Sequence, residues 1–183
     1  MPLKAQNSHL LLIDFQERLM PVVQNVEQVI RNAAILVEAA HMLKIPVTVS
    51  EQYPKGLGLT IAPLRERIPA EDIIEKITFS AFREEKFHDV LETNNEADRH
   101  QLIITGAETH ICVLQTALDA LEAGYDVFMV SDAVSSRTQA SIDAARERFI
   151  AAGGRWVTTE MVVFEWLEKA GTPEFKTLSA LIK

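Results

Sequence analysis

Three residues of the sequence carry side chains that together could transfer an acyl group: the carboxylate of Asp14, the ammonium of Lys76 and the thiol of Cys112. Each lies at or shortly beyond the end of a short apolar run that is predicted to form a strand. In an open α/β sheet, ligands bind beyond the carboxyl ends of the strands. A base, a cation and a thiol brought to that edge would form a self-consistent acyl-transfer site.

Cys112 is the candidate nucleophile of this set. Thr109 is a plausible N-cap, which makes Cys112 the third residue of a predicted helix. A thiolate there would be stabilised by backbone N–H groups and by the helix dipole, so we expect the pKa of Cys112 to lie below that of a free thiol. The alternative is that a lone cysteine in an α/β core is an inert, small apolar residue. Position alone leaves both interpretations open.

Asp14 and Lys76 also have simpler interpretations. A carboxylate at the end of a buried strand costs free energy unless it is paired, so Asp14 needs a partner. Otherwise it caps the short segment that follows it. Lys76 stands between Ile74 and Ile77, which is an apolar setting for an ammonium. The alternative for this lysine is a side chain that extends along the surface to solvent.

Six further residues near the predicted strand ends are expected to line a substrate pocket: Phe15, Gln16, Tyr53, Phe79, Phe82 and His110. The aromatic residues could equally belong to the core, and His110 could equally lie in a surface loop. No cluster of His and Asp has the spacing of metal ligands, and no Gly-x-Gly-x-x-Gly motif is present. We therefore expect neither a metal ion nor a cofactor.

The elements that must position these residues alternate along the chain. Apolar runs without polar alternation are typical of parallel strands covered on both faces, and they occur at 10–13, 47–49, 73–74, 102–104 and 127–130, with 156–157 as a weak edge strand. Helices are predicted at about 26–43, 84–92, 109–123, 138–153, 162–167 and 172–182. The pattern predicts one α/β domain over residues 1–183, a three-layer, doubly wound parallel sheet with helices on both faces. The stretch 51–72 is expected to be an irregular lid or interface arm.

Composition excludes several classes of function. The net charge is −8, so the surface should repel nucleic acids and anionic membranes. The single cysteine allows no internal disulfide, the apolar runs are far too short to span a membrane, and no signal segment is visible, so we expect a cytoplasmic protein. Its partners are expected to be a small-molecule substrate and copies of itself, as a dimer or tetramer, because the apolar segments 162–167 and 175–182 could cover a partner surface.

The chain resembles the isochorismatase-like cysteine hydrolases, the superfamily that includes nicotinamidases and N-carbamoylsarcosine amidases. The matching motifs are Leu-Ile-Asp14-Phe-Gln16, Lys76-Ile-Thr-Phe-Ser80-Ala-Phe82, and Thr105-Gly-Ala-Glu-Thr-His-Ile-Cys112-Val-Leu-Gln-Thr116-Ala117. The stretch Glu51-Gln-Tyr-Pro-Lys-Gly-Leu-Gly58 is similar to that of the uncharacterised isochorismatase-domain-containing proteins. The resemblance covers nearly the whole chain.

The resemblance implies a sheet of strand order 3-2-1-4-5-6 and an Asp-Lys-Cys catalytic triad, here Asp14, Lys76 and Cys112. It also implies a cis peptide bond between Ala107 and Glu108. The backbone N–H groups of Glu108 and Cys112 would then form an oxyanion hole. Asp14 would accept the thiol proton, and Lys76 would lower the pKa of Cys112.

Two departures narrow the implied activity. Nicotinamidases of this superfamily resemble one another in a metal site of Asp and His after the second strand, whereas residues 50–53 here read Ser-Glu-Gln-Tyr. Members that cleave the vinyl ether of isochorismate generally lack the cysteine. The sequence therefore favours a metal-independent cysteine hydrolase that cleaves a C–N bond through a thioester. The alternatives are vinyl-ether hydrolysis and a binding or scaffold protein without turnover.

Overall fold

The computed structural model describes residues 1–182, and its centre is a six-stranded sheet of order β3-β2-β1-β4-β5-β6. All neighbouring strands are parallel, which confirms the predicted doubly wound α/β fold. The strands are β1 (Ser8–Ile13), β2 (Val47–Gln52), β3 (Ile73–Lys76), β4 (Gln101–Ala107), β5 (Asp126–Ser135) and β6 (Arg155–Val157). The weak run at 156–157 is indeed a short edge strand.

The central strands are buried because helices cover both faces of the sheet. Every residue of β1 and of β4 is buried. Along β1, Leu10 and Leu12 pack into the core on one face, while Leu11 and Ile13 pack into the core on the other face. Side chains of a strand alternate between the faces, so an uninterrupted apolar run serves both cores.

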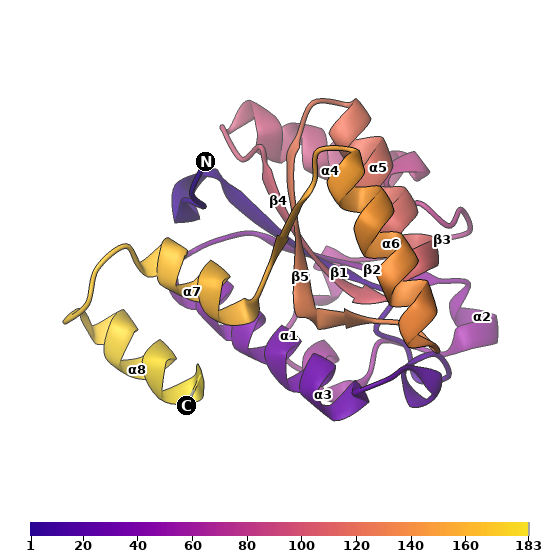
Figure 1. Cartoon of the computed structure of the whole chain (residues 1–183), viewed down its shortest axis with the longest axis horizontal. Helices are drawn as coiled ribbons and strands as arrows, with labels where there is room; N and C mark the ends of the chain where they lie inside the picture. The colour runs from indigo at the N-terminus through magenta and orange to yellow at the C-terminus, as the bar shows by residue number, and fades with distance from the viewer. Residues whose placement is uncertain (183) are drawn as a thin grey trace.

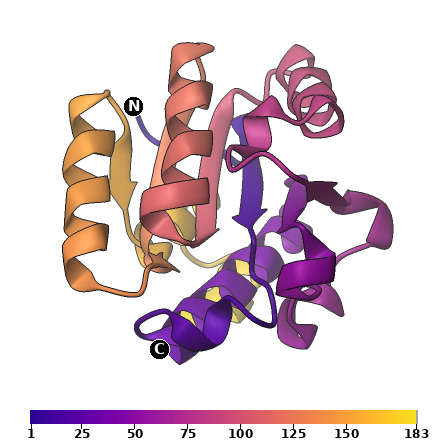
Figure 2. The same cartoon turned by 90° about the vertical axis from the view of Figure 1, so that its right-hand side faces the viewer.

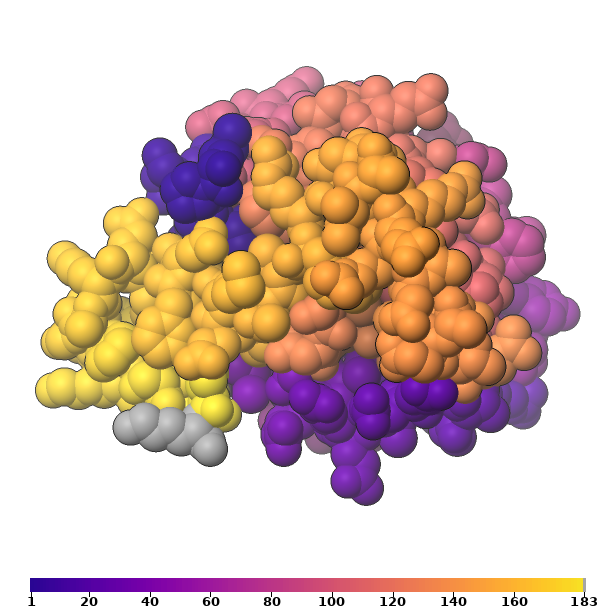
Figure 3. All heavy atoms as spheres, in the orientation of Figure 1, coloured from indigo at the N-terminus to yellow at the C-terminus, as the bar shows by residue number. Residues whose placement is uncertain are grey.

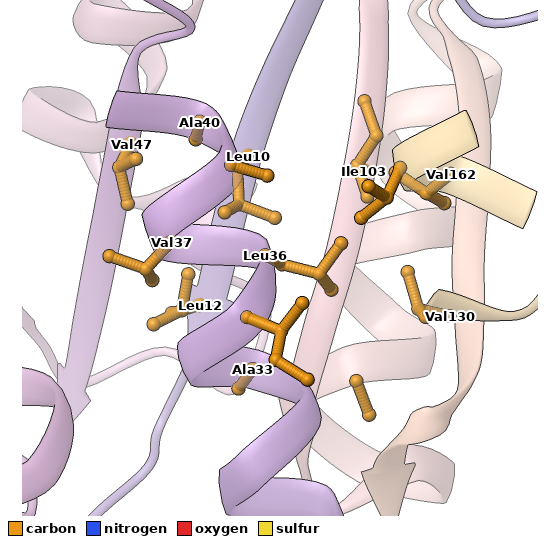
Figure 4. Packing of buried hydrophobic residues seen from close by; sticks show 14 of the residues in the cluster. Leu10, Leu12, Ala33, Leu36, Val37, Ala40, Val47, Ile103, Val130 and Val162 are labelled. Atoms are coloured by element: carbon orange, nitrogen blue, oxygen red, sulfur yellow. The ribbon is translucent and has the colours of Figure 1, made fainter. Parts of the chain in front are cut away.

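The first face is covered by α1 (Val26–Met42), α3 (Ala62–Arg65), α7 (Thr159–Leu167) and α8 (Pro173–Ile182) (Figure 1). The apolar residues of α1 recur at helical spacing, and Ala33, Leu36 and Val37 face the sheet. Figure 4 shows these side chains directed at residues of β1 and β4, among them Leu12 and Ile103.

The second face is covered by α4 (Glu85–Glu96), α5 (Leu114–Glu122) and α6 (Gln139–Ala151). In the orthogonal view α5 and α6 run side by side, with α1 on the other side of the sheet (Figure 2). α6 begins where the sequence predicts, because the Thr138 side chain caps it by accepting the N–H of Ser141. Between β4 and α5 lies a single π-helical turn, η5 (Thr109–Val113).

Some boundaries differ from the predicted ones. α4 continues to Glu96, and α7 begins at Thr159 because the Thr158 side chain accepts the N–H of Met161. β5 continues to Ser135, five residues beyond the predicted run 127–130. The stretch 51–72, expected to be irregular, contains α2 (Pro54–Leu57), α3 and the 3₁₀ turn η3 (Ala70–Asp72). The remaining 3₁₀ turns are η1 (Ala5–Asn7), η2 (Met20–Val22) and η4 (Ala81–Arg83).

The C-terminal helices α7 and α8 form the projecting end of the molecule on the left of the space-filling view (Figure 3). α8 begins directly after Thr172, the first residue of the predicted helix, and the Thr172 hydroxyl accepts the N–H of Phe175 at 3.0 Å. Within residues 1–182, no helix combines the length and the apolar character needed to cross a lipid bilayer.

Candidate active site

The register of the sheet brings the three candidate residues to one edge. Ile13 pairs with both Ser50 and Gly106, and Gln52 pairs with Lys76, so the carboxyl ends of β1 to β4 lie in line. Asp14 directly follows β1, Lys76 ends β3, and Cys112 lies in the turn after β4.

Asp14 and Lys76 form an ion pair that is closed off from solvent. The Nζ atom of Lys76 lies 2.8 Å from Oδ2 of Asp14, and both side chains are 0% exposed. The hydroxyl of Ser50 donates to Oδ1 of Asp14 at 2.6 Å. Oδ1 is therefore hydrogen-bonded and Oδ2 is ion-paired, which compensates the cost of burying the charge. The partner expected for Asp14 is Lys76. Asp14 is therefore not simply a cap, and the Lys76 side chain does not extend to solvent.

The ammonium of Lys76 is held by three further oxygens. It donates to Oε1 of Gln52 at 2.6 Å and to the carbonyl oxygens of Thr78 and Phe79 at 3.2 and 3.0 Å. These carbonyls belong to residues 77–80, which we call the lysine loop. The carboxylate of Glu84 organises this loop by accepting the N–H groups of Ile77 and Thr78.

Cys112 is the fourth residue of the π-helical turn, and it is 7% exposed. Thr109 is not the N-cap that the sequence predicts, because the turn begins at Thr109 itself, after Glu108, without a side-chain cap. The thiol lies close enough to the Asp14 carboxylate and the Lys76 ammonium for both groups to act on its pKa. The fold thus brings the three candidate side chains to one place.

The ionisation of Cys112 corrects the expectation from its position near a helix start. Burial, followed by the negative charge of Asp14, raises the pKa of Cys112 to about 12, although Lys76 opposes the shift. Burial also raises the pKa of Asp14, with Lys76 again opposing. In this structure the sulfur of Cys112 is therefore a protonated thiol, and the nearby Asp14 carboxylate binds a proton more tightly than a solvent-exposed one.

The end of β4 approaches β1 more closely than any side chain would allow. Gly106 has φ +127°, and a Cβ at this position would collide with the carbonyl oxygen of Ile13. The next peptide bond, between Ala107 and Glu108, is cis, at the position that the family resemblance implies. No backbone hydrogen bond of the described chain uses the N–H of Glu108, whose carboxylate forms an ion pair with Arg137 at 2.8 Å.

Two residues expected to line the pocket have other surroundings. Phe15 is fully buried in the core beneath α1. Gln16 is fully buried, and its amide donates to the carbonyl oxygens of Gln52 and Gly58 at 2.9 and 2.7 Å. Its Oε1 atom accepts the N–H of Gln52 at 2.7 Å. Gln16 therefore fastens the stretch after β2 to the end of β1.

The other four expected pocket residues surround the site at different depths. Tyr53 and Phe79 are 52% and 57% exposed. Tyr53 follows Gln52, whose side chain contacts Lys76, and Phe79 contacts Lys76 through its own carbonyl oxygen. Phe82 instead packs edge-on against Tyr125 and His88, beside α4. His110 is half-buried, and its Nδ1 atom lies 2.9 Å from the Ser136 hydroxyl.

The structure adds three residues that sequence reasoning did not assign to the site: Ser50, Gln52 and Thr116. Ser50 contacts Asp14, Gln52 contacts Lys76, and the Thr116 hydroxyl donates to the carbonyl oxygen of Cys112 at 2.6 Å. The available signal for the first two was a polar Ser-Glu-Gln run at the end of a buried strand. Among residues 1–182, no group of three or more His, Cys, Asp or Glu side chains is arranged to hold a metal ion.

Comparison with known proteins shows the family and the fold. The model of the isochorismatase domain matches residues 8–161. The chain belongs to the isochorismatase domain family. A secreted isochorismatase effector, Isc1, of Phytophthora sojae is 37% identical over 97% of this chain and 85% of its own length. Isochorismatase domain-containing protein 2 of Danio rerio is 37% identical over 98% of this isochorismatase-family chain and 89% of its own length.

Solved structures share the same fold. A structure described as MAR1 ribonuclease from Caenorhabditis elegans has a TM-score of 0.91 at 34% identity, covering 100% of this chain and 92% of that one. YcaC from Pseudomonas aeruginosa, solved with hexane-2,5-diol and covalent acrylamide, has a TM-score of 0.92 at 26% identity, covering 98% and 91%. YcaC of Escherichia coli, described as an octameric hydrolase of unknown specificity, has a TM-score of 0.92 at 25% identity, covering 99% and 90%. The chain is an isochorismatase-family hydrolase domain.

Proposed function

We propose that this isochorismatase-family protein is a metal-independent cysteine hydrolase that cleaves a C–N bond of a small molecule. The observation that carries the proposal is the buried Asp14–Lys76 ion pair, which lies close enough to Cys112 for both of its charges to act on the pKa of the thiol. Keeping a buried ion pair next to a thiol has no evident packing advantage, since apolar residues of similar volume commonly replace such pairs without loss of stability.

The reaction begins with proton transfer from the Cys112 thiol to Asp14 as the sulfur attacks the amide carbon. A new C–S bond forms, and the carbonyl π electrons move to oxygen. The collapse of this tetrahedral adduct breaks the C–N bond, and protonated Asp14 gives its proton to the departing amine. Asp14 then takes a proton from water as the water oxygen attacks the thioester carbon. The C–S bond breaks, the carboxylic acid product leaves, and protonated Asp14 returns its proton to the sulfur of Cys112.

The pKa shifts support Asp14 as the base rather than a thiolate formed in advance. A thiol with a raised pKa needs its proton removed during attack, and a carboxylate whose pKa is raised by burial is the stronger base for that step. Lys76 keeps Asp14 ionised before the attack and stabilises the sulfur as negative charge develops on it.

The backbone N–H groups of Glu108 and Cys112 are proposed to hold the oxyanion. The N–H of Glu108 is available because the described chain makes no backbone hydrogen bond with it. Losing one such donor typically lowers kcat by about 10²–10³-fold. Tyr53 and Phe79 carry exposed aromatic rings next to the site, and we propose that they contact the part of the substrate that does not react.

Covalent acrylamide in the YcaC structure from Pseudomonas aeruginosa supports a nucleophile in this fold, because acrylamide is an electrophile that thiolates attack. The family model itself favours vinyl-ether hydrolysis as a second candidate. RNA cleavage is a third candidate, because the Caenorhabditis elegans neighbour is described as a ribonuclease. The net charge of −8 opposes this candidate, since it repels the phosphate backbone of RNA.

The test is a screen of small primary amides for ammonia release by the wild-type protein, Cys112→Ser and Cys112→Ala. We expect turnover in the wild type, a loss of at least about 10³-fold in both variants, and an acyl adduct on Cys112 by mass spectrometry. Because Cys112 is the single cysteine, the adduct identifies the residue.

Parallel assays follow pyruvate from isochorismate and the cleavage of RNA. Pyruvate formation that persists in Cys112→Ala would replace the amidase proposal with vinyl-ether hydrolysis. RNA cleavage that persists in the same variant would favour the ribonuclease. No turnover in any of these assays would favour a scaffold protein.

We further propose a homo-oligomer. The Escherichia coli YcaC neighbour is octameric, and the C-terminal end of this chain exposes Met161, Phe164 and Leu181 by 46%, 41% and 45%. Light scattering should give a mass that is a multiple of the 20.5 kDa chain, and Phe164→Asp should shift it toward the monomer. A monomeric wild-type protein at micromolar concentration would contradict this.

A further inference from the structure

Thr116 connects two separate segments of the candidate site through one hydroxyl. It is fully buried in α5, one helical turn after Cys112. Its Oγ1 atom donates to the carbonyl oxygen of Cys112 at 2.6 Å and accepts the backbone N–H of Ala81 at 2.9 Å. Ala81 is fully buried and directly follows the lysine loop. The hydroxyl therefore bridges the turn that carries the thiol and the segment that surrounds the ammonium.

The lysine loop transmits this contact to the ion pair. Its carbonyl groups at Thr78 and Phe79 accept hydrogen bonds from Nζ of Lys76. The hydroxyl of Thr78 also donates to the carbonyl oxygen of Ser80 at 2.8 Å, which fixes the loop internally. One end of the loop is thus bound to Lys76, and the other end is bound through Ala81 to Thr116.

We propose that Thr116 is a positioning residue that sets the distance between the sulfur of Cys112 and the Asp14–Lys76 pair. The inference rests on the proposed function only in taking these three residues as the working groups. A helical threonine can donate its hydroxyl to the carbonyl oxygen four residues earlier, as Thr116 does to Cys112. Thr116 in addition accepts the N–H of Ala81 with a lone pair, so its two partners belong to different elements of the site.

A positioning role has a signature that a packing role lacks. The pKa of Cys112 is raised to about 12 by burial and by Asp14. If the turn moves away from the ion pair, these influences weaken and the pKa returns toward its ordinary value. The thiol then reacts faster with an alkylating reagent at neutral pH, while hydrolysis, which needs the three groups together, becomes slower.

The experiment measures the second-order rate of Cys112 alkylation by iodoacetamide at about pH 8 in the wild type, Thr116→Val and Thr116→Ser. Valine has nearly the same shape but no hydroxyl. We expect Thr116→Val to react about tenfold faster or more, and Thr116→Ser to match the wild type. With a substrate from the amide screen, kcat of Thr116→Val should fall by about 10²-fold, with KM little changed.

Thr105→Val is the matched control. Thr105 is also fully buried, and its hydroxyl donates to the carbonyl oxygen of Leu11 at 3.0 Å, so this variant loses the same kind of hydrogen bond away from both segments. Ala81→Pro removes the donor at the other end of the bridge. Ser80 has φ −74° and ψ 121°, which a following proline accepts, and the first position of a helical turn tolerates proline.

Ala81→Pro should reproduce the faster alkylation of Thr116→Val, and it decides the question if Thr116→Val does not fold. Equal alkylation rates and equal hydrolysis in Thr116→Val and Thr105→Val would overturn the proposal and leave Thr116 a packing role. A wild type that hydrolyses no amide would overturn the proposed function instead, while the alkylation rates would still test the bridge.

Discussion

At the scale of single residues, the site combines a carboxylate, an ammonium and a thiol in a space that excludes water. The Lys76 ammonium contacts four oxygen atoms, of which only Oδ2 of Asp14 belongs to a charged group. Ionisation of the Cys112 thiol is opposed by burial and by the Asp14 carboxylate and is favoured by Lys76. The balance between Asp14 and Lys76 thus decides the protonation state of Cys112.

Asp14→Asn separates the acidity of the thiol from its catalytic use. Asparagine keeps the shape and the hydrogen bond from Ser50 but removes the negative charge, so Lys76 is left to stabilise a thiolate. We expect the pKa of Cys112 to fall and alkylation at neutral pH to accelerate, whereas amide hydrolysis drops by about 10²–10⁴-fold because the base is lost. The pH profile of alkylation and the hydrolysis rate measure the two effects. Slower alkylation in this variant would show that Asp14 assists ionisation in the resting protein.

The residues that carry motifs were predictable, whereas their supporting partners were not. Asp14, Lys76 and Cys112 stand at strand ends, a local property that can be read from apolar runs. The raised pKa of Cys112 was not predictable, because it depends on burial and on Asp14, which approaches from another strand. The contact of Gln52 with Lys76 was not predictable for a similar reason, because it depends on the register that pairs these two residues of β2 and β3.

At the scale of elements, the close approach of β1 and β4 fixes where Asp14 and Cys112 leave the sheet. Gly106 permits this approach, because its φ of +127° is reserved for glycine and because the Ile13 carbonyl occupies the space of a side chain. The types of the long helices and of the strands followed from hydrophobic periodicity, and the errors lie at their ends and in the short helices α2 and α3, which are too short to show a period. The π-helical turn at Thr109–Val113 was missed because its N–H to C=O spacing leaves no pattern in residue types.

Gly106→Ala tests this packing against a second glycine with a positive φ. Gly124 has φ +92°, but a Cβ there would meet no atom within 4 Å. Gly124→Ala should therefore cost only the backbone term, about 1 kcal/mol, whereas Gly106→Ala should cost about 3 kcal/mol or more, since β1 must move as well. Urea unfolding of both variants measures the difference. Similar losses would mean that β1 can shift without strain.

At the scale of the whole molecule, the two cores on either side of the sheet contain ionisable groups as well as apolar ones. His9, on the central strand β1, is fully buried, and its Nε2 atom lies 2.9 Å from the Thr48 hydroxyl. Its Nδ1 atom has no partner. Burial, with a smaller contribution from Arg99, lowers the pKa of His9 to about 3.

This histidine predicts acid sensitivity of the fold. Because the pKa of His9 is depressed, the unfolded chain protonates this histidine near pH 6.5, whereas the folded chain protonates it only near pH 3. The free energy of unfolding is therefore unaffected by His9 above pH 6.5 and decreases as the pH falls from 6.5 toward 3. His9 should lower the free energy of unfolding by about 2 kcal/mol between pH 7 and pH 5. In His9→Gln the loss over this interval should be smaller by that amount, as measured by urea unfolding. The same pH dependence in both proteins would contradict the prediction.

The chain has one cysteine, which follows β4, and the two charged groups that act on its thiol follow β1 and end β3. Its thiol is therefore shielded only once β1, β3 and β4 have all joined the sheet. Brief pulses of a thiol reagent during refolding should thus label Cys112 until the last of these strands docks. The accessibility of the Cys112 sulfur thus reports when the fold is complete, at the same atom on which the proposed chemistry depends.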